Sequence, residues 1–75
     1  MKYRIKDLRE DKDLTQSTLA NYLNMKQNSY SYLENEKITI DIEYIIKLAK
    51  FYNVSTDYIL KLTDNPKPYP KVKRD

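Results

Sequence analysis

The stretch from Thr15 to Asn35 constrains the fold of this 75-residue chain more than any other. It contains two apolar patterns of helical spacing, separated by a short polar turn. In the first pattern, Leu19, Ala20 and Leu23 fall at i, i+1 and i+4, on one face of a helix. Thr15 lies just ahead of them, where its hydroxyl can accept a hydrogen bond from an unpaired backbone N–H of the first turn. The sequence therefore predicts a short helix capped by Thr15.

The second pattern predicts a helix that begins near Gln27 and has one apolar and one polar side. Tyr30 and Leu33 fall at i and i+3 and form its narrow apolar stripe. The opposite side is polar or aromatic and consists of Gln27, Asn28, Ser31 and Tyr32. A helix that is anchored on one side and carries amides on the other fits the major groove of DNA. We interpret this segment as a candidate recognition helix.

Three further helices are predicted around this pair. Residues 3–12 place Ile5 and Leu8 at helical spacing, and a last short helix follows Ser55 as its cap. Between them, Asp41 is the predicted cap of a longer helix with a broad apolar stripe, formed by Ile42, Ile45, Ile46, Leu48, Ala49 and Tyr52. No segment shows a clear strand pattern, so the predicted fold class is all-α with five helices.

The chain contains no glycine, so other residue types must end its helices. A helix end often needs one residue with a left-handed backbone, which glycine adopts most easily and Asn or Asp next. Such residues follow the predicted helices at Asp13, Asn24, Asn35 or Glu36, and Asn53. Their spacing supports five short helices rather than fewer long ones.

The end of the chain differs in composition from the rest, which suggests a helical domain at residues 1–64 and a basic tail at 65–75. The tail contains all three prolines, so we expect it to be extended or disordered. Basic and acidic side chains are equal in number over residues 1–65, and the net charge of +3 therefore comes from the tail. Bulk charge does not by itself argue for nucleic-acid binding by the folded part.

Several classes of function are disfavoured by composition. The chain has no cysteine and no histidine, which removes thiolate and imidazole chemistry and the commonest metal ligands. No apolar run approaches the roughly 20 residues that span a bilayer, and the charged N-terminus lacks the apolar core of a signal peptide. We expect a cytoplasmic binding protein with no metal, cofactor or membrane contact, no evident small-molecule ligand, and no enzymatic activity.

A series of short motifs occurs in a specific order along the chain. These are Leu8-Arg9, Leu14-Thr15-Gln16, Leu19-Ala20, Leu23-Asn24-Met25, Leu33-Glu34-Asn35 and Leu48-Ala49. In order and spacing they resemble the phage repressor and Cro-type (XRE-like) helix-turn-helix family, over about residues 4–62. The resemblance implies a compact five-helix bundle like that of lambda repressor, bacterial or phage-encoded, that binds double-stranded DNA.

The resemblance also implies roles for individual residues. Base contacts would come from Gln27, Asn28, Ser31 and Tyr32. Phosphate contacts would come from Gln16, Lys26, Asn35, Lys37 and Thr39. Gln16 would also brace the recognition helix. Arg9 and Glu34 match a buried ion pair that ties the first helix to the recognition helix. An exposed pair would contribute only about 0–1 kcal/mol, whereas removal of one partner of a buried pair would cost about 3–5 kcal/mol.

Two positions depart from the family pattern. Glu36 stands where the family has a glycine, and an acid near a phosphate would weaken binding slightly. Tyr32 is bulkier than the small polar or basic residues common at its position. It could stack on a sugar or reach a thymine methyl, or it could cover the edge of the core.

The leading hypothesis is a sequence-specific transcriptional regulator, most simply a repressor, that binds a pseudo-palindromic operator as a dimer. Tyr58, Leu60 and Leu62 are candidates for a dimer patch, with completion of the core as the competing explanation. The alternative hypothesis is an antitoxin or adaptor that uses the same fold to hold a protein partner. The neutral folded part and the eight tyrosines motivate this alternative.

Overall fold

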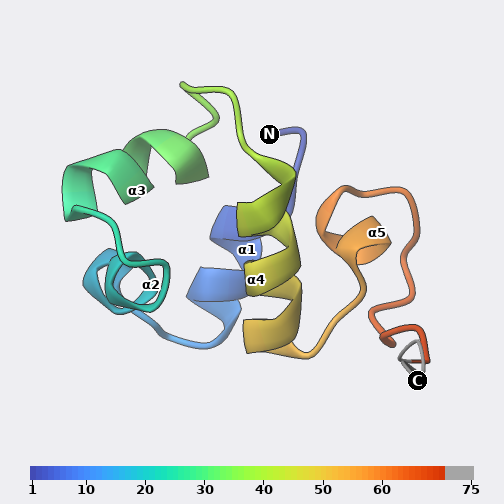
Figure 1. Cartoon of the computed structure of the whole chain (residues 1–75). Coiled ribbons are helices and arrows are strands. Elements are labelled where there is room, and N and C mark those ends of the chain that lie inside the picture. Colours follow the sequence, from blue (N-terminus) through green and yellow to red (C-terminus); the bar gives the residue numbers. More distant parts are fainter. Residues whose placement is uncertain (71–75) are drawn as a thin grey trace, which may run out of the picture.

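The computed structural model describes residues 1–70 of the chain. They form five short helices joined by turns and loops. In order they are α1 (Ile5–Asp11), α2 (Gln16–Tyr22), α3 (Gln27–Glu34), α4 (Ile42–Tyr52) and α5 (Thr56–Ile59) (Figure 1). No strand occurs among these residues. The predicted all-α fold with five helices is therefore confirmed, although α1 is shorter than the predicted 3–12.

Two of the three predicted N-caps form as expected. The hydroxyl of Thr15 accepts a hydrogen bond from the Thr18 N–H at 3.2 Å, and the hydroxyl of Ser55 accepts one from the Tyr58 N–H at 3.0 Å. Asp41 has the extended backbone of a cap residue before α4, but its side chain makes no capping hydrogen bond. The start of α4 is thus defined by backbone geometry, and the predicted side-chain cap at Asp41 is wrong.

Residues with a left-handed backbone occur at the helix ends, as the absence of glycine predicts. Asn24 follows α2 with φ 57°, and Asn53 follows α4 with φ 55°. Asp13 has φ 54°, and of the two candidates after α3 it is Glu36 that is left-handed, with φ 58°. Lys61, after α5, also has φ 60° and was not predicted, because lysine has no side-chain preference for this region.

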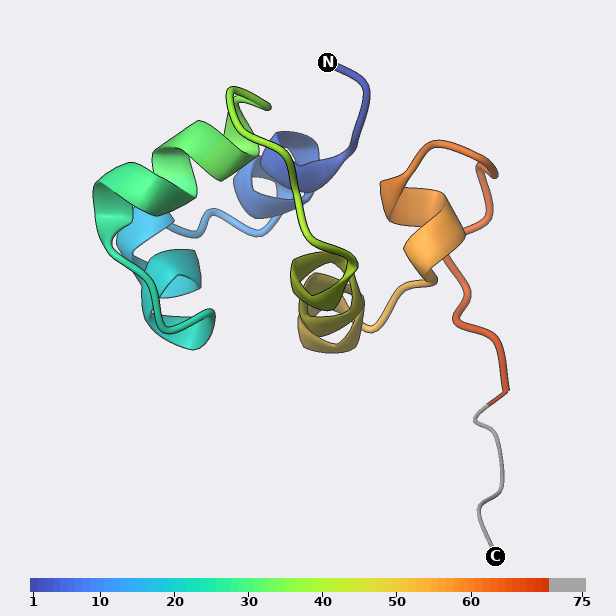
Figure 2. The same ribbon diagram turned by 45° about the horizontal axis from the view of Figure 1, so that its top comes forward.

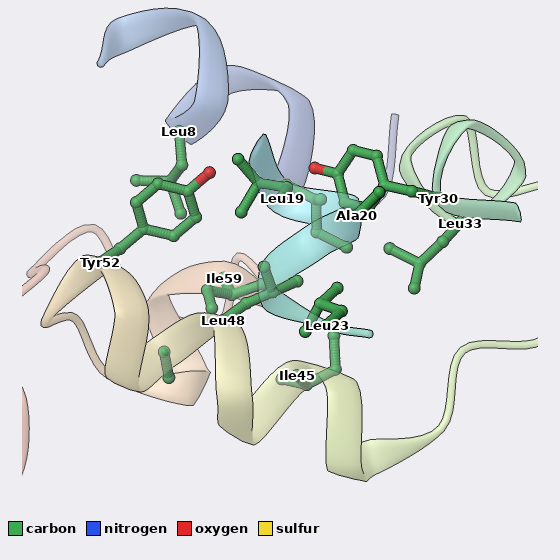
Figure 3. Close-up of a cluster of buried hydrophobic side chains, with 12 residues drawn as sticks. Leu8, Leu19, Ala20, Leu23, Tyr30, Leu33, Ile45, Leu48, Tyr52 and Ile59 are labelled. Atoms are coloured by element: carbon green, nitrogen blue, oxygen red, sulfur yellow. The ribbon is translucent and has the colours of Figure 1, made fainter. Parts of the chain in front are cut away.

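The core lies where α4 faces the other helices. In two views α4 stands between the α2–α3 pair and α5, with α1 packed beside it (Figures 1 and 2). Tyr30 and Leu33 of α3 are fully buried, as predicted. Side chains from all five helices meet there (Figure 3), and the buried cluster consists of Ile5, Leu8, Leu19, Ala20, Leu23, Tyr30, Leu33, Ile45, Leu48, Ala49, Tyr52 and Ile59.

The apolar stripe of α4 is narrower than the sequence predicts. Ile45, Leu48 and Tyr52, which succeed one another at helical spacing, face the core. Ile42 is 60% exposed and Ile46 is 38% exposed, so both predicted core positions are wrong. They lie one turn apart, on the part of the α4 surface that the other helices do not cover.

The chain after α5 returns along that helix without forming another one. The Ser55 N–H donates to the Pro66 carbonyl at 3.1 Å, and the Tyr69 hydroxyl donates to Asp57 at 2.8 Å. The part of the predicted tail at residues 65–70 is thus non-helical and held against α5, while residues 71–75 lie outside the described residues. Within residues 1–70, no helix has the length and apolar character to cross a membrane.

The left-handed turn at Asn24 can be tested by substitution. Asn24→Gly should leave the free energy of unfolding nearly unchanged, because glycine adopts this backbone without a steric cost. Asn24→Val should lower it by about 1–2 kcal/mol, the cost of a left-handed residue with a Cβ branch. Urea denaturation monitored by circular dichroism measures the free energy of unfolding of each variant. Since Asn24 is exposed, lost packing does not complicate the comparison. Equal stability of the two variants would contradict this account.

Candidate nucleic-acid interface

The turn between α2 and α3 is sharp and internally hydrogen-bonded. Left-handed Asn24 redirects the chain, and the next N–H, that of Met25, donates to the Ala20 carbonyl at 2.9 Å. A side-chain hydrogen bond of 3.2 Å, from the Ser17 hydroxyl to the Gln27 amide oxygen, joins the starts of the two helices. The pair α2–α3 is therefore one unit with a fixed angle between its helices.

The inner side of α3 is fixed by a buried carboxylate. Glu34 is 1% exposed and accepts two hydrogen bonds from Arg9 of α1, from Nε at 2.5 Å and from Nη2 at 3.1 Å. The Gln16 amide of α2 donates to it at 2.8 Å, and the Tyr30 hydroxyl donates at 3.2 Å. Arg9 also donates to the Leu14 carbonyl at 2.8 Å. Three helices are thus joined through one side chain.

The protonation states of this network follow from its contacts. Burial by itself raises the pKa of Glu34, but hydrogen bonds from Arg9 and Gln16 and the charge of Arg9 outweigh it, so the net pKa lies below the ordinary 4.5. Burial, followed by the nearby Glu34 charge, raises the pKa of Tyr30 well above its ordinary value. At neutral pH the network holds a carboxylate, a guanidinium and a neutral phenol.

The outer side of α3 presents the predicted base-contact residues. Gln27, Asn28 and Tyr32 are exposed and Ser31 is partly exposed, all on one unbroken helix. Tyr32 is 53% exposed, which leaves its ring available to a ligand. Within residues 1–70, the side-chain N–H groups of Gln27 and Asn28 donate to no protein acceptor. The arrangement is a row of amide and hydroxyl groups that projects from a buried anchor.

The residues predicted to contact phosphates lie around this row. Some are exposed, and others already donate hydrogen bonds within the protein. Lys26 precedes α3, and Lys37 and Thr39 follow it; all three are exposed. Gln16 is committed to Glu34 through one of its N–H groups. The Asn35 side chain folds back along α3 and donates to the Ser31 carbonyl at 2.9 Å.

The sequence analysis did not predict that Tyr30 and Gln16 hydrogen-bond to Glu34. Tyr30 was predicted as a core residue only, although its i, i+4 spacing to Glu34 places the two side chains on one helix face. For Gln16 the resemblance implied both a phosphate contact and a bracing of the recognition helix; its amide does hydrogen-bond α3, but Glu34 as the acceptor was not predicted. The predicted pairing of Arg9 with Glu34 is present and is buried on the Glu34 side.

The three candidates for a dimer patch do not share one environment. Tyr58 and Leu60 are partly buried and pack against the core, and the guanidinium of Arg4 lies 4.4 Å from the Tyr58 ring centre. Leu62 is 73% exposed. Core completion, the competing explanation, accounts for part of the burial of the first two.

The geometry of α2, the turn and the exposed α3 defines the class of the protein as a helix-turn-helix module. The sequence model of the helix-turn-helix family matches residues 5–59, and the chain belongs to that family. The predicted resemblance to phage repressors and Cro-type proteins is thereby confirmed.

The curated relatives are named as transcriptional regulators. The chain is 39% identical over 71 residues to the uncharacterized HTH-type transcriptional regulator YobD of Bacillus subtilis strain 168, covering 95% of this chain and 62% of YobD. It is 39% identical to the HTH-type transcriptional regulator ImmR of the same organism, over 76% of this chain and 45% of ImmR. It is also 39% identical to the cryptic phage CTXphi transcriptional repressor RstR of Vibrio cholerae, over 68% of this chain and 46% of RstR.

The match covers only part of each relative, since the chain spans between 45% and 62% of their lengths. Family membership supports a role in DNA-binding transcription regulation and the prediction that the chain is not an enzyme. Among residues 1–70 there is no cluster of three or more side chains of the metal-binding types.

The depressed pKa of Glu34 predicts the direction of the pH dependence of stability. A carboxyl group whose pKa is lower in the folded chain stabilises the fold fully above its unfolded pKa, near 4.5, and this stabilisation is lost as the pH falls through the folded pKa. We expect the side-chain carboxyl of Glu34 to titrate below 4.5 in an NMR pH series, and denaturation midpoints to fall over the same range. Titration at or above 4.5 would contradict the network described here.

Two tyrosine hydroxyls provide a matched test of the same network. Tyr30→Phe removes a donor to a charged carboxylate and should lower the free energy of unfolding by about 1.5–3 kcal/mol. Tyr52→Phe removes a buried hydroxyl that bonds to no side chain or backbone group within residues 1–70, so it should be neutral or stabilising. Thermal and urea unfolding of both variants measures the difference, and a larger loss for Tyr52→Phe would refute it.

Proposed function

We propose that this chain is a sequence-specific double-stranded DNA-binding transcriptional regulator that acts as a repressor. In this proposal α3 lies in the major groove, and the chain binds as a homodimer to a pseudo-palindromic operator in the cytoplasm of a bacterial cell. The name of RstR, a transcriptional repressor, supports the choice of repression.

The observation that carries the proposal is the two-sided character of α3. The residues of its inner side, Tyr30, Leu33 and Glu34, are buried. Its outer side presents Gln27 and Asn28 to solvent. Amide side chains pair their donor and acceptor with N6 and N7 of adenine in the major groove, and a good bidentate pair discriminates between bases by about 1–3 kcal/mol. Both amides are exposed, and their oxygens, which accept the Ser17 hydroxyl and the Ser29 N–H, each have a second lone pair for a base.

The Glu34 network supports the proposal by holding α3 in place. Arg9 and Gln16 connect α3 to α1 and α2 through charge-assisted hydrogen bonds. A recognition helix that is already ordered loses little conformational entropy on binding, so more of the contact energy appears as affinity.

The dimer follows from the small size of a single module. One helix-turn-helix buries limited area on DNA, and two-fold dimers reach useful specificity by occupying half-sites about one helical turn apart. Leu62, the most exposed large apolar side chain within residues 1–70, supports the choice of the segment after α5 as the contact between subunits.

Two substitutions separate sequence recognition from phosphate binding. A duplex is first selected from a random pool, which also reveals half-site spacing. Asn28→Ala should reduce the preference for that duplex over a scrambled one by about 1–3 kcal/mol, because it removes a base contact. Lys37→Ala should weaken both duplexes alike and reduce the slope of log K against log salt by about 0.9 per subunit.

Lys50→Ala is the matched control, because Lys50 is exposed on the last turn of α4 and not on α3 or the loop after it. Fluorescence anisotropy over a salt series provides all of these measurements. If the parent chain bound no duplex at any salt concentration, the proposal would fail, and the protein-interaction hypothesis would take its place.

A further inference from the structure

The loop after α3 is joined to the N-terminal segment by the carboxylate of Glu36. One carboxylate oxygen accepts the Lys2 N–H at 3.0 Å, and the other accepts the Tyr3 N–H, also at 3.0 Å. The two residues lie far from Glu36 in sequence, and nothing in the helical patterns indicated the contact. We call these two hydrogen bonds the Glu36 clamp.

Two further hydrogen bonds join the N-terminal segment, residues 1–4, to the chain around α5. The Lys61 ammonium donates to the Met1 carbonyl at 2.9 Å, and the Arg4 N–H donates to the Ile59 carbonyl at 2.8 Å. The segment is thus fixed between the loop after α3 and the chain around α5. Its backbone direction is set, and so is the point from which the Lys2 side chain extends.

Glu36 makes the clamp from a backbone conformation that is unfavourable for a glutamate. Glu36 is left-handed, with φ 58°, at the position where the family pattern has a glycine. A glutamate there bears a steric cost that glycine would avoid. Glycine, however, has no side chain with which to accept the two N–H groups.

The clamp brings basic side chains together beside the recognition helix. Lys2, Glu36, Lys37 and Thr39 line one surface hollow of about 430 Å³. Lys2 and Lys37 are both exposed, so two cations border the hollow against the one carboxylate, which is already occupied by backbone donors. This local excess of positive charge lies in a folded part whose basic and acidic side chains are equal in number overall.

We propose that Lys2 is a further DNA-phosphate contact and that Glu36 is the positioning residue that holds it beside Lys37. The inference rests on the proposed function, because it adds a contact to the same interface. Lys2 is exposed and Glu36 only partly so, and the cation that Glu36 positions thereby offsets the repulsion of the Glu36 charge on a phosphate.

The contact is tested by the salt dependence of duplex binding. Lys2→Ala should reduce the slope of log K against log salt by about 0.9 per subunit, and Lys50→Ala should leave it unchanged. In the background of Glu36→Gly, the same Lys2→Ala change should have less than half of that effect, because the lysine is no longer held in place. Glu36→Asn serves as a second background, since asparagine also tolerates the left-handed backbone but cannot reach the segment.

The clamp itself is tested without DNA. Glu36→Gly should speed hydrogen exchange of the Lys2 and Tyr3 amides by about tenfold or more and leave that of core amides such as Leu48 unchanged. Unchanged exchange at Lys2 and Tyr3 would overturn the clamp.

The binding outcomes distinguish this inference from the function on which it rests. If the parent chain binds and Lys2→Ala leaves the slope unchanged, the inference alone is overturned. If Lys2→Ala acts equally in the parent and in both Glu36 backgrounds, Glu36 does not position the lysine. A parent chain that binds no duplex overturns both proposals together.

Discussion

The buried carboxylate of Glu34 is the interaction on which the arrangement of the helices depends. A charged group at 1% exposure is tolerated only when its hydrogen-bonding capacity is met, and here Arg9, Gln16 and Tyr30 meet it. These partners come from α1, α2 and α3, so moving α1 away from α3 would leave the buried carboxylate without its ion pair, and moving α2 would remove one of its hydrogen bonds. Apolar contacts alone would allow the helices to slide, whereas four directed hydrogen bonds favour one geometry.

Much of the fold follows from local patterns in the sequence. The spacing of apolar residues predicts all five helices, because each helix buries one face and the period of that face is visible in the chain. Thr15, Ser55, Asn24 and Asn53 were predicted correctly at helix ends, because their side chains and backbone preferences act within a few residues. The all-α class and the family membership were therefore accessible without coordinates.

Features that depend on distant parts of the chain were not accessible. Ile42 and Ile46 have the same spacing as buried residues, and only the packing of other helices decides that they remain exposed. The partners of Glu36 lie 33 and 34 residues away, near the N-terminus, so its acidic side chain suggested only repulsion from DNA. At the candidate interface, helical spacing placed the polar residues of α3 opposite its apolar stripe, the resemblance implied their role as base contacts, and the structure added their exposure.

The absence of glycine has a consequence for the denatured state. A chain without glycine has fewer backbone conformations to lose on folding, and each Gly-to-Ala replacement at a compatible site is worth about 0.4–1 kcal/mol in this respect. The lower conformational entropy of the unfolded chain thus offsets part of the steric cost at the left-handed helix ends. One small protein can therefore combine tight turns in its folded state with a less flexible unfolded chain, provided that Asn, Asp and a few longer polar residues make the turns.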